Sequence, residues 1–465
     1  MAAVAAGKAE QRIDWFDRLS SRQMGLSRRL WQKLVSHYQQ HAYLANIVPL
    51  PATETDPAFD RELGSDRVHF CTAGEAVRVL DLDTGLYRPS TIDDVYDLFR
   101  LADALEHIHH VGQPIVATEI GLRDAHDLSV AYAGMAGTRK SFGFSTATAS
   151  VVDALVAMGD MVLGVDGGFR KRPFCVVGHC PIVSPLRFGK ETSEVAVRCA
   201  ELGLVSDMCV APLAGATAPA ALAGALVQSV AETLAGLVQV HLVRPGATMH
   251  FGNWVFVADL RTGAFSGGSG ETALLMAAAA QMARFYGLPG SVAAGMTDSK
   301  LLDYQAGYEK GMSIALAGHA GGGLVMEAGG MMASLMGASF EGLVMDNDMI
   351  GAVQRTLKGI EVSDATLSYE VIEDVVLRGP QHFLGHPQTL QLMQSEYLYP
   401  SVANRMSLSE WEAADRPGLV ATAHERARGI LATHHPAYIN PERDRAIRAR
   451  FPIQLRPEAM RPSST

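Results

Sequence analysis

The chain's most distinctive pattern is a glycine-rich apolar stretch from Gly321 to Asp348, GGGLVMEAGGMMASLMGASFEGLVMDND. It is too apolar for a surface loop and too interrupted for one helix, so the pattern predicts two buried strands, at 324–327 and 343–346. Each expected strand ends in a carboxylate, Glu327 or Asp346. Parallel barrels carry their chemistry at the carboxyl ends of their strands, so both residues are expected at a barrel mouth.

The same alternation of short apolar runs and alanine-rich helical segments continues through much of the chain. Strands are predicted at 114–120, 140–146, 173–182, 205–212, 237–246, 291–298, 323–329 and 342–348. Helices are predicted at 145–158, 190–202, 219–237, 270–286, 304–317 and 350–358. Alternating strands and helices favour parallel pairing, and about 250 residues is the usual size of a (β/α)8 barrel. A doubly wound open sheet is the competing topology, but no GxGxxG motif follows the first strand.

Segments on either side of these repeats look different. Apolar positions at helical spacing predict an amphipathic helix over 23–44, and 68–91 resembles a small hairpin unit with turn residues at 83–85. Ser90 or Thr91 is expected to cap the helix that follows. The expected fold is therefore α/β, a TIM barrel over 111–360 with an N-terminal helix and hairpin extension over 1–110 and a C-terminal helical appendage over 361–465.

Composition narrows the class of partner. A formal net charge of -10 argues against nonspecific binding to nucleic acid or to an anionic membrane. The apolar runs near Leu222 and Leu274 contain polar and charged residues, which favours buried barrel helices over membrane spans. Five cysteines without a CxxC pair fit a reducing cytoplasm, and the N-terminal residues do not form a secretory signal.

Candidate site residues follow from the barrel geometry, because chemistry is expected at the carboxyl ends of strands and in the following loops. That rule selects Glu119, Phe142, Phe144, His179, Met249, His250, Phe251, Trp254, Asp298, Glu327 and Asp346. Each of them alone is more often a structural residue of the core, so their common location carries the prediction.

The long segment after residue 246 combines aromatic residues with glycines at 263, 267, 268 and 270. An aromatic wall suits a quaternary ammonium ion through cation–π attraction. The glycines could instead hold a phosphate, but Glu271 at the start of the next helix would repel an anion.

A zinc site is the metal alternative. Cys175 and His179 share one face of a predicted strand, whereas Cys180 faces the other way. Only Cys209, on the next strand, offers a further nearby sulfur, so a complete ligand set is missing and no directly bound metal is expected.

Several stretches together resemble the trimethylamine methyltransferase family, in its branch lacking pyrrolysine. They are VRVLDLDTGLYRPST (77–91), CPIVSPLRF (180–188), ETALLMAAAAQMARFYGLP (271–289), MTDSKLLDYQAGYEK (296–310), LVMDND (343–348), LKGIEV (357–362) and HFLGHPQT (382–389). They cover the chain from about Val68 to Arg450 in the family's order. The resemblance implies a (β/α)8 barrel that demethylates a methylamine and passes the methyl group to the Co(I) of a separate corrinoid protein.

The missing pyrrolysine changes the implied substrate. Ordinary residues stand at the equivalent position, which we place near Met331 to Ser334. A quaternary ammonium can leave directly as a neutral amine, so the resemblance implies a betaine such as glycine betaine, proline betaine or carnitine. The corrinoid would be carried by the partner protein, and a homo-oligomer is expected.

The resemblance also suggests roles for individual residues, because the protein needs no general acid but must hold the N-methyl group in line with cobalt in a dry mouth. As catalytic residues we expect Glu327, Glu119 and Asp298. Substrate-binding residues are expected to be Phe142, His250, Phe251, Trp254, Tyr304, Met331 and Met332. Residues expected to face the corrinoid are Gly263, Gly267, Gly268, His382 and His386.

Two other functions compete with methyl transfer. One is a metal-dependent barrel lyase or hydrolase built on Glu327 and Asp298. The other is a protein without catalytic activity that binds a betaine or a corrinoid protein.

Overall fold

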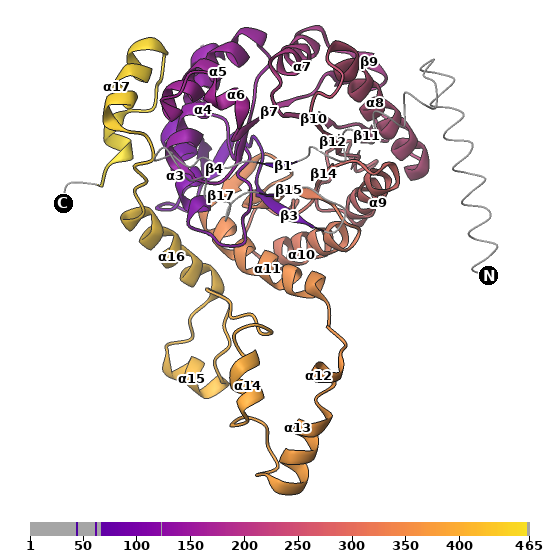
Figure 1. Cartoon of the computed structure of the whole chain (residues 1–465), viewed down its shortest axis with the longest axis vertical. Helices are drawn as coiled ribbons and strands as arrows, with labels where there is room; N and C mark the ends of the chain where they lie inside the picture. Colours follow the sequence, from indigo (N-terminus) through magenta and orange to yellow (C-terminus); the bar gives the residue numbers. More distant parts are fainter. Residues whose placement is uncertain (1–42, 45–60, 63–66, 122, 463–465) are drawn as a thin grey trace.

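The computed structural model describes residues 43–44, 61–62, 67–121 and 123–462. A ring of helices surrounds a parallel sheet, and an arm of short helices projects from this body (Figure 1). The amphipathic helix predicted at 23–44 lies outside the described residues, apart from Tyr43–Leu44, which forms β1 and pairs with β2, Arg61–Glu62.

The sheet is a closed barrel. Seven parallel strands follow the order β3-β15-β14-β12-β10-β7-β6. Both edge strands bridge to the short segment at 110–111, through Cys71 to His110 and through Phe142 to Val111, so this segment takes the place of an eighth strand. The strands are β3 (His69–Thr72), β6 (Phe142–Ser145), β7 (Cys175–His179), β10 (Ser206–Val210), β12 (Met249–Asn253), β14 (Gly290–Ala293) and β15 (Leu324–Gly329).

Helices alternate with these strands, which confirms the predicted (β/α)8 architecture. They are α3 (Ile92–Asp103), α4 (Arg123–Gly137), α5 (Ala149–Leu163), α7 (Lys190–Leu202), α8 (Leu222–Val243), α9 (Gly270–Tyr286), α10 (Tyr304–His319) and α11 (Phe340–Lys358), with a short α6 (Gly168–Lys171) before β7. Within the described chain, α8 is the one helix long and apolar enough to cross a membrane, and it packs on β10 and β12 as a barrel helix.

Three predicted strands are wrong. The run at 114–120 is a connection, and the true first strand is β3, in the segment assigned to the N-terminal extension. The run at 237–246 mostly continues α8, which ends at Val243, and the strand follows at β12. The run at 342–348 lies in α11, because Ser339 accepts a hydrogen bond from the N–H of Gly342 and starts a helix there.

Short strands at the edge of the body form a second sheet. The predicted hairpin is present as β4 (Arg78–Leu80) and β5 (Tyr87–Pro89). It pairs with β17 (Gly337–Ser339), which pairs with β16 (Met331–Met332). The remaining short strands are β8 (Ile182–Val183), β9 (Arg187–Phe188), β11 (Leu213–Ala214) and β13 (Phe256–Val257). Thr91 caps α3 in a capping box with Asp94, as one of the two predicted caps.

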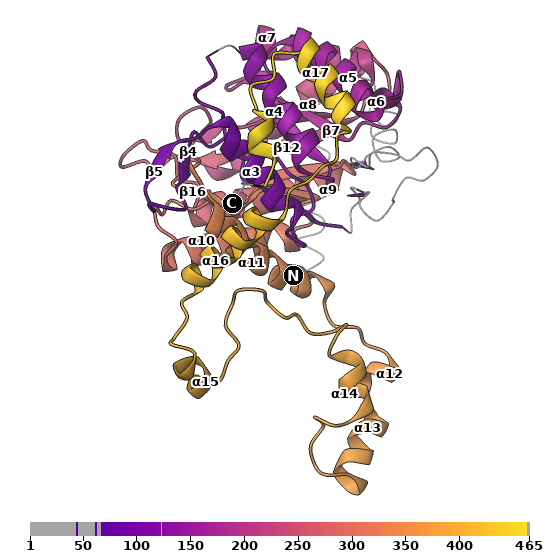
Figure 2. The same cartoon turned by 90° about the vertical axis from the view of Figure 1, so that its left-hand side faces the viewer.

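The C-terminal part divides into an arm and a wrap around the barrel. After α11 the arm contains α12 (Asp364–Leu367), α13 (Tyr369–Glu373), the π-helical turn η2 (Asp374–Arg378) and α14 (Pro387–Leu392). The chain then passes through α15 (Leu408–Ala413) to α16 (Leu419–Thr433), α17 (Pro441–Arg450) and η3 (Pro457–Met460). Helix α16 packs on α3 and α11, and α17 packs on α5 (Figure 2).

Candidate active site

A cavity of about 310 Å³ opens among the carboxyl ends of the barrel strands. Its lining comes from β6, β7, β10, β13 and β15 and from the segments that follow β3, β7, β10, β12, β16 and residues 110–111. The lining residues are Gly74, Glu75, Gly112, Gln113, Gly143, Phe144, Ser145, Val176, Gly178, His179, Cys180, Asp207, Cys209, Ala211, Trp254, Phe256, Met326, Glu327 and Leu335. This is the position at which barrel enzymes carry their active sites.

Glu327 lies at the end of β15 in an unusual backbone conformation. Its φ is 67°, and the register between β15 and β3 shifts between Val325 and Gly329 around it. A left-handed conformation at a residue other than glycine is strained, and such strain concentrates at functional sites. The distortion turns the Glu327 side chain into the cavity, where Oε2 accepts a hydrogen bond from the N–H of Gly74 at 2.8 Å.

Burial raises the pKa of the Glu327 carboxyl to about 8, with a smaller contribution from the nearby Glu75 carboxylate and an opposing one from the Gly74 N–H. The side chain is therefore largely protonated at neutral pH and becomes anionic as the pH rises past 8. Burial disfavours the charged form of a carboxyl, and the charge of Lys310 only partly opposes the rise; no Lys or Arg lines the cavity among the described residues.

Glu75 is the second carboxyl of the pair. It follows β3, and its φ is 56°. Its side chain is exposed to the cavity, with protein around the cavity. Burial raises its pKa, and a hydrogen bond with Ser145 opposes the rise. Two carboxyls with raised pKa values interact across one cavity. Such a pair suits a cationic ligand, because a bound positive charge stabilises the carboxylate forms and the carboxyls release their protons.

A third carboxylate, Asp207, stays ionised on β10. Burial would raise its pKa, but His250 Nδ1 lies 3.1 Å from its Oδ1 and the net shift is downward. His179 contacts the Ser206 hydroxyl, and burial lowers the pKa of His179 to about 4, so its ring is neutral at pH 7. Its Nδ1 has no hydrogen-bond partner within the described residues, which leaves one polar atom beside the cavity for a ligand.

Aromatic side chains complete the wall. Trp254 and Phe256 lie with their ring centroids 6.4 Å apart, and the Trp254 indole N–H donates to the Ser291 hydroxyl at 3.3 Å. Phe144 lines the cavity from β6. Aromatic faces next to carboxylates, without a basic side chain, favour an organic cation over an anion.

Sequence comparison agrees with this arrangement. A family model described as trimethylamine methyltransferase matches residues 47–458. The chain belongs to the trimethylamine methyltransferase family. It is 33% identical over 387 residues to the trimethylamine methyltransferase MttB of Methanosarcina barkeri, covering 81% of this chain and 76% of that one. It is 29% identical over 387 residues to a glycine betaine methyltransferase of Desulfitobacterium hafniense, covering 83% of this chain and 80% of that one.

The resemblance to the trimethylamine methyltransferase family is thereby confirmed, and the protein is a methyltransferase. A further relative, trimethylamine methyltransferase MttB of another Desulfitobacterium hafniense strain, is 30% identical over 383 residues and covers 82% of this chain and 76% of its own. Relatives with different named substrates match at similar identity. The comparison therefore shows that the chain is a methyltransferase, and the substrate has to be inferred from the residues of the site.

Of the residues expected at the site of this family member, the structure brings four to the cavity: Phe144, His179, Trp254 and Glu327. Asp298 lies nearby but its oxygens already accept from Ser266 Oγ at 2.8 Å, the Gly267 N–H at 2.9 Å and Ser334 Oγ at 2.8 Å. In this position Asp298 ties the glycine-rich loop to the turn after β16. Gly268 leaves room for Glu309, and Gly263 sits in a turn with a φ of 73°.

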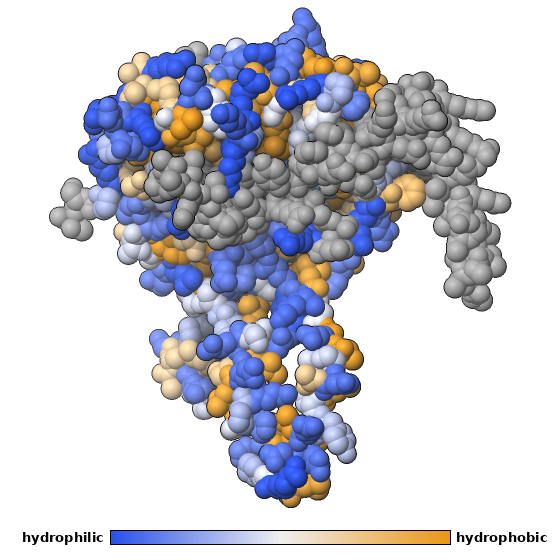
Figure 3. All heavy atoms as spheres, viewed as in Figure 1, coloured by the Kyte–Doolittle hydropathy of each residue, from blue (hydrophilic) through white to orange (hydrophobic). Residues whose placement is uncertain are grey.

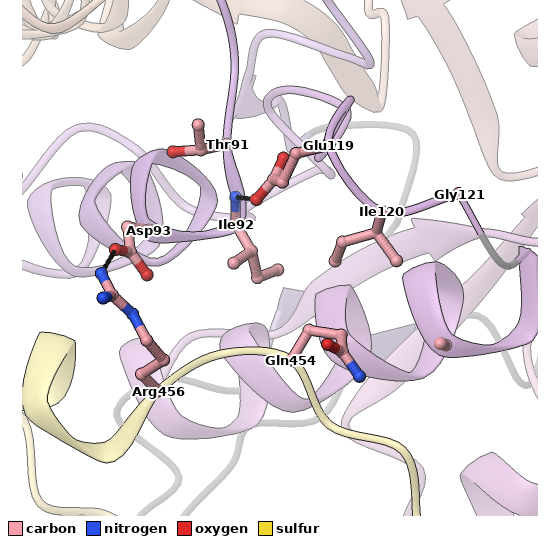
Figure 4. Close-up of a pocket in the computed structure, with 9 residues that line it drawn as sticks. Thr91, Ile92, Asp93, Glu119, Ile120, Gly121, Gln454 and Arg456 are labelled. Carbon is pink, nitrogen blue, oxygen red and sulfur yellow. Dashed lines mark hydrogen bonds and ion pairs between the residues drawn. The ribbon is translucent and has the colours of Figure 1, made fainter.

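Glu119 belongs to a different cleft, drawn in Figure 4. Its Oε1 accepts a hydrogen bond from the N–H of Ile92 at 2.7 Å, so the side chain satisfies the first turn of α3. On the far side of the cleft Arg456 pairs with Asp93 at 2.6 Å. The Glu119 carboxylate therefore stabilises the start of α3, away from the barrel mouth.

Other expected substrate-binding residues lie elsewhere. Phe142 and Phe251 are fully buried, packed against Phe99 and Tyr286 respectively, and Met331 and Met332 are buried in β16. Tyr304 is the first residue of α10 and is 87% exposed on the outer surface. His250 acts through Asp207, as described above. His382 and His386 lie on the arm, where His386 caps α14.

Several cavity residues were absent from the expected set: Glu75, Gln113, Asp207, Phe256 and Leu335. Glu75 was missed because β3 was assigned to the extension, although HFCTAGE shows the same apolar run ending in an acid as LVMEAG. Leu335 reaches the cavity through three successive left-handed residues, Ala333, Ser334 and Leu335, a conformation that the sequence does not signal.

The candidate zinc ligands do not separate as the strand alternation predicted, because His179 lies at the cavity with Cys180 and not with Cys175. Cys175 is buried away from the cavity, whereas His179, Cys180 and Cys209 line it. Among the described residues no group of three or more His, Cys, Asp and Glu side chains is arranged to hold a metal ion. All five cysteines are free.

Proposed function

We propose that this methyltransferase moves a methyl group from a quaternary ammonium compound to the corrinoid of a partner protein. The observation that supports it is the cavity itself, with Glu75, Asp207 and Glu327 beside Trp254, Phe256 and Phe144. Three carboxyls in a cavity that no Lys or Arg of the described chain lines favour a cation, and burial raises the pKa of both Glu327 and Glu75.

The chemistry of a quaternary ammonium suits these residues. The leaving group is a neutral tertiary amine, so no side chain has to deliver a proton. Glu327 and Glu75 would neutralise the substrate's charge, Trp254 and Phe256 would contact its methyl groups, and the buried walls would exclude water. Positive charge on nitrogen fades as the methyl leaves, so binding that is too tight would stabilise substrate more than transition state.

A betaine carries a carboxylate as well as a cation. That carboxylate would be repelled by Glu75, Asp207 and Glu327, so it needs a hydrogen-bond donor elsewhere in the cavity. His179 Nδ1, which has no partner in the described part of the chain, is the polar atom available for it. The glycine betaine methyltransferase relative supports a betaine, and we name glycine betaine or a similar betaine as the substrate. A quaternary amine without a carboxylate, such as choline, is the competing substrate on charge alone.

The corrinoid would approach the open carboxyl end of the barrel, and when bound it supplies the nucleophile that accepts the methyl group. Glycines at 74, 112, 143 and 178 line this opening and leave backbone rather than side chains there. A Cβ at Gly178 would approach the Ser145 hydroxyl to within 2.6 Å, so small residues keep the opening wide. We further propose a cytoplasmic location, where a reduced corrinoid and free thiols persist.

The test supplies purified protein with reduced cobalamin and, in turn, glycine betaine, proline betaine, carnitine and choline. Formation of methylcobalamin is followed by absorbance. We expect at least one of these compounds to react, and Glu327→Gln and Glu75→Gln to lower kcat/KM by about tenfold or more, as loss of a charge partner in a desolvated site predicts. Glu425→Gln, at an exposed position on α16, is the matched control.

Failure of all four compounds to react or to bind would reject the proposal. Binding without methyl transfer would identify a binding protein instead. Activity that depends on an added divalent ion and is lost with chelator would favour a metal-dependent lyase or hydrolase.

A further inference from the structure

Two cysteines lie next to each other in the wall of the active-site cavity. Cys180 directly follows β7, and Cys209 belongs to β10, the parallel strand that pairs with β7. In the register of the two strands Met208 lies opposite His179, so the next residues along them, Cys209 and Cys180, are neighbours as well. Both cysteine side chains line the cavity.

The spacing of the two strands suits a bond between these sulfurs. Neighbouring strands of a sheet lie about 4.8 Å apart, and the Cα atoms of a disulfide are usually about 4.4–6.8 Å apart. The two side chains already contact each other, because the Cys209 thiol shares a hydrogen bond with the Cys180 side chain. Both thiols are free. A disulfide between them therefore needs little movement of the barrel strands.

The two thiols differ in how readily they react. Cys180 is exposed, whereas Cys209 is partly buried. The hydrogen bond with Cys180 and burial raise the pKa of the Cys209 thiol, and the Asp207 and Glu327 carboxylates add to the rise. The thiolate is the nucleophile in thiol–disulfide exchange, so Cys180 should react first with an oxidant and Cys209 second.

We infer that Cys180 and Cys209 are a redox-active pair, which a small-molecule disulfide oxidises to an intramolecular disulfide in the cavity wall. The Cys180 thiolate attacks one sulfur of the oxidant RSSR, which forms a mixed disulfide and releases RS⁻. The Cys209 thiolate then attacks the Cys180 sulfur and releases the second RS⁻. The two cysteines lose two protons and two electrons, and RSSR is reduced to two RSH.

Two other cysteines offer an internal comparison. Cys175 and Cys199 also lie near each other, since burial and then the nearby Cys199 thiol raise the pKa of Cys175. Both are buried in the hydrophobic core, at 2% and 0% exposed, and neither lines the cavity. An oxidant that enters the cavity therefore meets Cys180 and Cys209 and does not reach this second pair.

The disulfide would also change the site, and this consequence rests on the proposed function. The Asp207 and Glu327 carboxylates are near enough to Cys209 to act on its thiol, and Asp207 lies two residues before Cys209 on the same face of β10. Joining Cys209 to Cys180 displaces the wall beside these carboxylates, and a displacement of about 1 Å can cost about 100-fold in rate. The enzyme would then stop under oxidising conditions, in which a reduced corrinoid does not persist either.

Peptide mass spectrometry tests the inference. The full chain is incubated with oxidised glutathione, the remaining thiols are blocked with N-ethylmaleimide, and the peptides are mapped without reduction. We expect a linked pair of peptides that contain Cys180 and Cys209, lighter by two hydrogen atoms than the separate peptides, and its loss on treatment with dithiothreitol. No link is expected between Cys175 and Cys199.

Substituted chains separate the roles of the two thiols. Cys209→Ser should accumulate a glutathione adduct at Cys180, and Cys180→Ser should form much less adduct. Cys180→Ser with Glu370→Cys is the matched control, because it keeps the number of cysteines and places an exposed thiol on α13 of the arm. Hydrophilic and hydrophobic residues are interspersed along this arm (Figure 3), which stands clear of the barrel in Figures 1 and 2. The control should therefore form an adduct at residue 370 and no link to Cys209.

Methyl transfer is measured on the wild-type chain before and after oxidation. We expect oxidation to lower kcat/KM by about tenfold or more, as displacement of a site wall predicts, and dithiothreitol to restore it. The activity of Cys180→Ser should not respond to oxidation. Absence of the link between Cys180 and Cys209 would overturn the inference, as would its formation together with an equal link between Cys175 and Cys199.

An unchanged kcat/KM in the linked chain would overturn the role of the disulfide as a switch. If the reduced chain transfers no methyl group from any donor, the proposed function fails and its consequence for catalysis fails with it. The mass spectra still decide whether the disulfide forms.

Discussion

The backbone N–H of Gly74 and the carboxylate of Glu327 are joined by a 2.8 Å hydrogen bond that links the first and last strands of the barrel. A Cβ at position 74 would overlap Glu327 Oε1. The absence of a side chain at Gly74 therefore sets where the Glu327 carboxylate lies.

Gly74→Ala should consequently displace the Glu327 carboxylate from its place in the cavity. We expect kcat/KM for the methyl donor to fall by about tenfold or more, as loss of a charge-assisted hydrogen bond predicts, with the far-ultraviolet circular dichroism unchanged. Gly429→Ala, on α16 with no atom near its Cβ, serves as the comparison for substitution of a glycine in general. Equal activity of Gly74→Ala and wild type would show that Glu327 does not act from this position.

The raised pKa of Glu327 predicts a pH dependence that the substrate itself cannot produce, because a quaternary ammonium has no proton to lose. Affinity for the cation should increase as the pH rises through about 8, where Glu327 becomes anionic. Isothermal titration calorimetry across this range should give a Kd that falls for wild type and falls less for Glu327→Gln, which keeps the raised pKa of Glu75.

Folding stability should move the other way with pH. The folded-state pKa of Glu327 lies above its ordinary value of 4.5, so between 4.5 and about 8 the folded chain holds a proton that the unfolded chain releases. The contribution of Glu327 to the free energy of unfolding is thus greatest below pH 4.5 and is lost as the pH rises through 8. Denaturant melts of wild type and Glu327→Gln should diverge in this window, and parallel curves would contradict the prediction.

Cys180 should be the thiol that reacts first with an alkylating agent. Burial raises the pKa of Cys71, Cys175 and Cys199, whereas Cys180 is exposed and lines the cavity. Treatment with iodoacetamide at neutral pH should modify Cys180 and slow the enzyme by narrowing the mouth. Peptide mass spectrometry locates the adduct, and Cys180→Ser should remain active after the same treatment. Full activity of the alkylated wild type would exclude a narrow passage there.

Lys310 and Asp346 form a buried ion pair at 2.8 Å that should be important for stability. Lys310 also donates to the Gly295 carbonyl, and Asp346 accepts from the Gly330 N–H. Lys310→Met leaves a buried carboxylate without its cation and should lower the free energy of unfolding by about 3–5 kcal/mol. The double variant Lys310→Met with Asp346→Leu should recover much of that loss in denaturant melts. If the double variant were less stable than Lys310→Met alone, the loss in the single variant would not come from an unpaired Asp346 carboxylate, and this prediction would be wrong.

The barrel could be predicted from the sequence because long helices with a clear apolar pattern define the repeat. The position of Glu327 could be predicted because LVMEAG is an apolar run with an acidic residue near its end. Asp346 sits in an equally apolar run, but the cap at Ser339 makes that run a helix. Phe142 faces outward from β6, and the sequence of a strand buried on both sides does not reveal which residues face inward. Glu75 required knowing that β3, only four residues long, is the first barrel strand.

Closure of the barrel by β3 and β15 also has a temporal consequence. Gly74 and Glu327 are 253 residues apart, so at about 5–20 residues per second a ribosome makes the second about 13–50 s after the first. A nascent chain that has folded its early helices still lacks Glu327. Of the carboxyl pair, it then contains only Glu75. The site at which the methyl donor binds is therefore incomplete until residue 327 of 465 has been made.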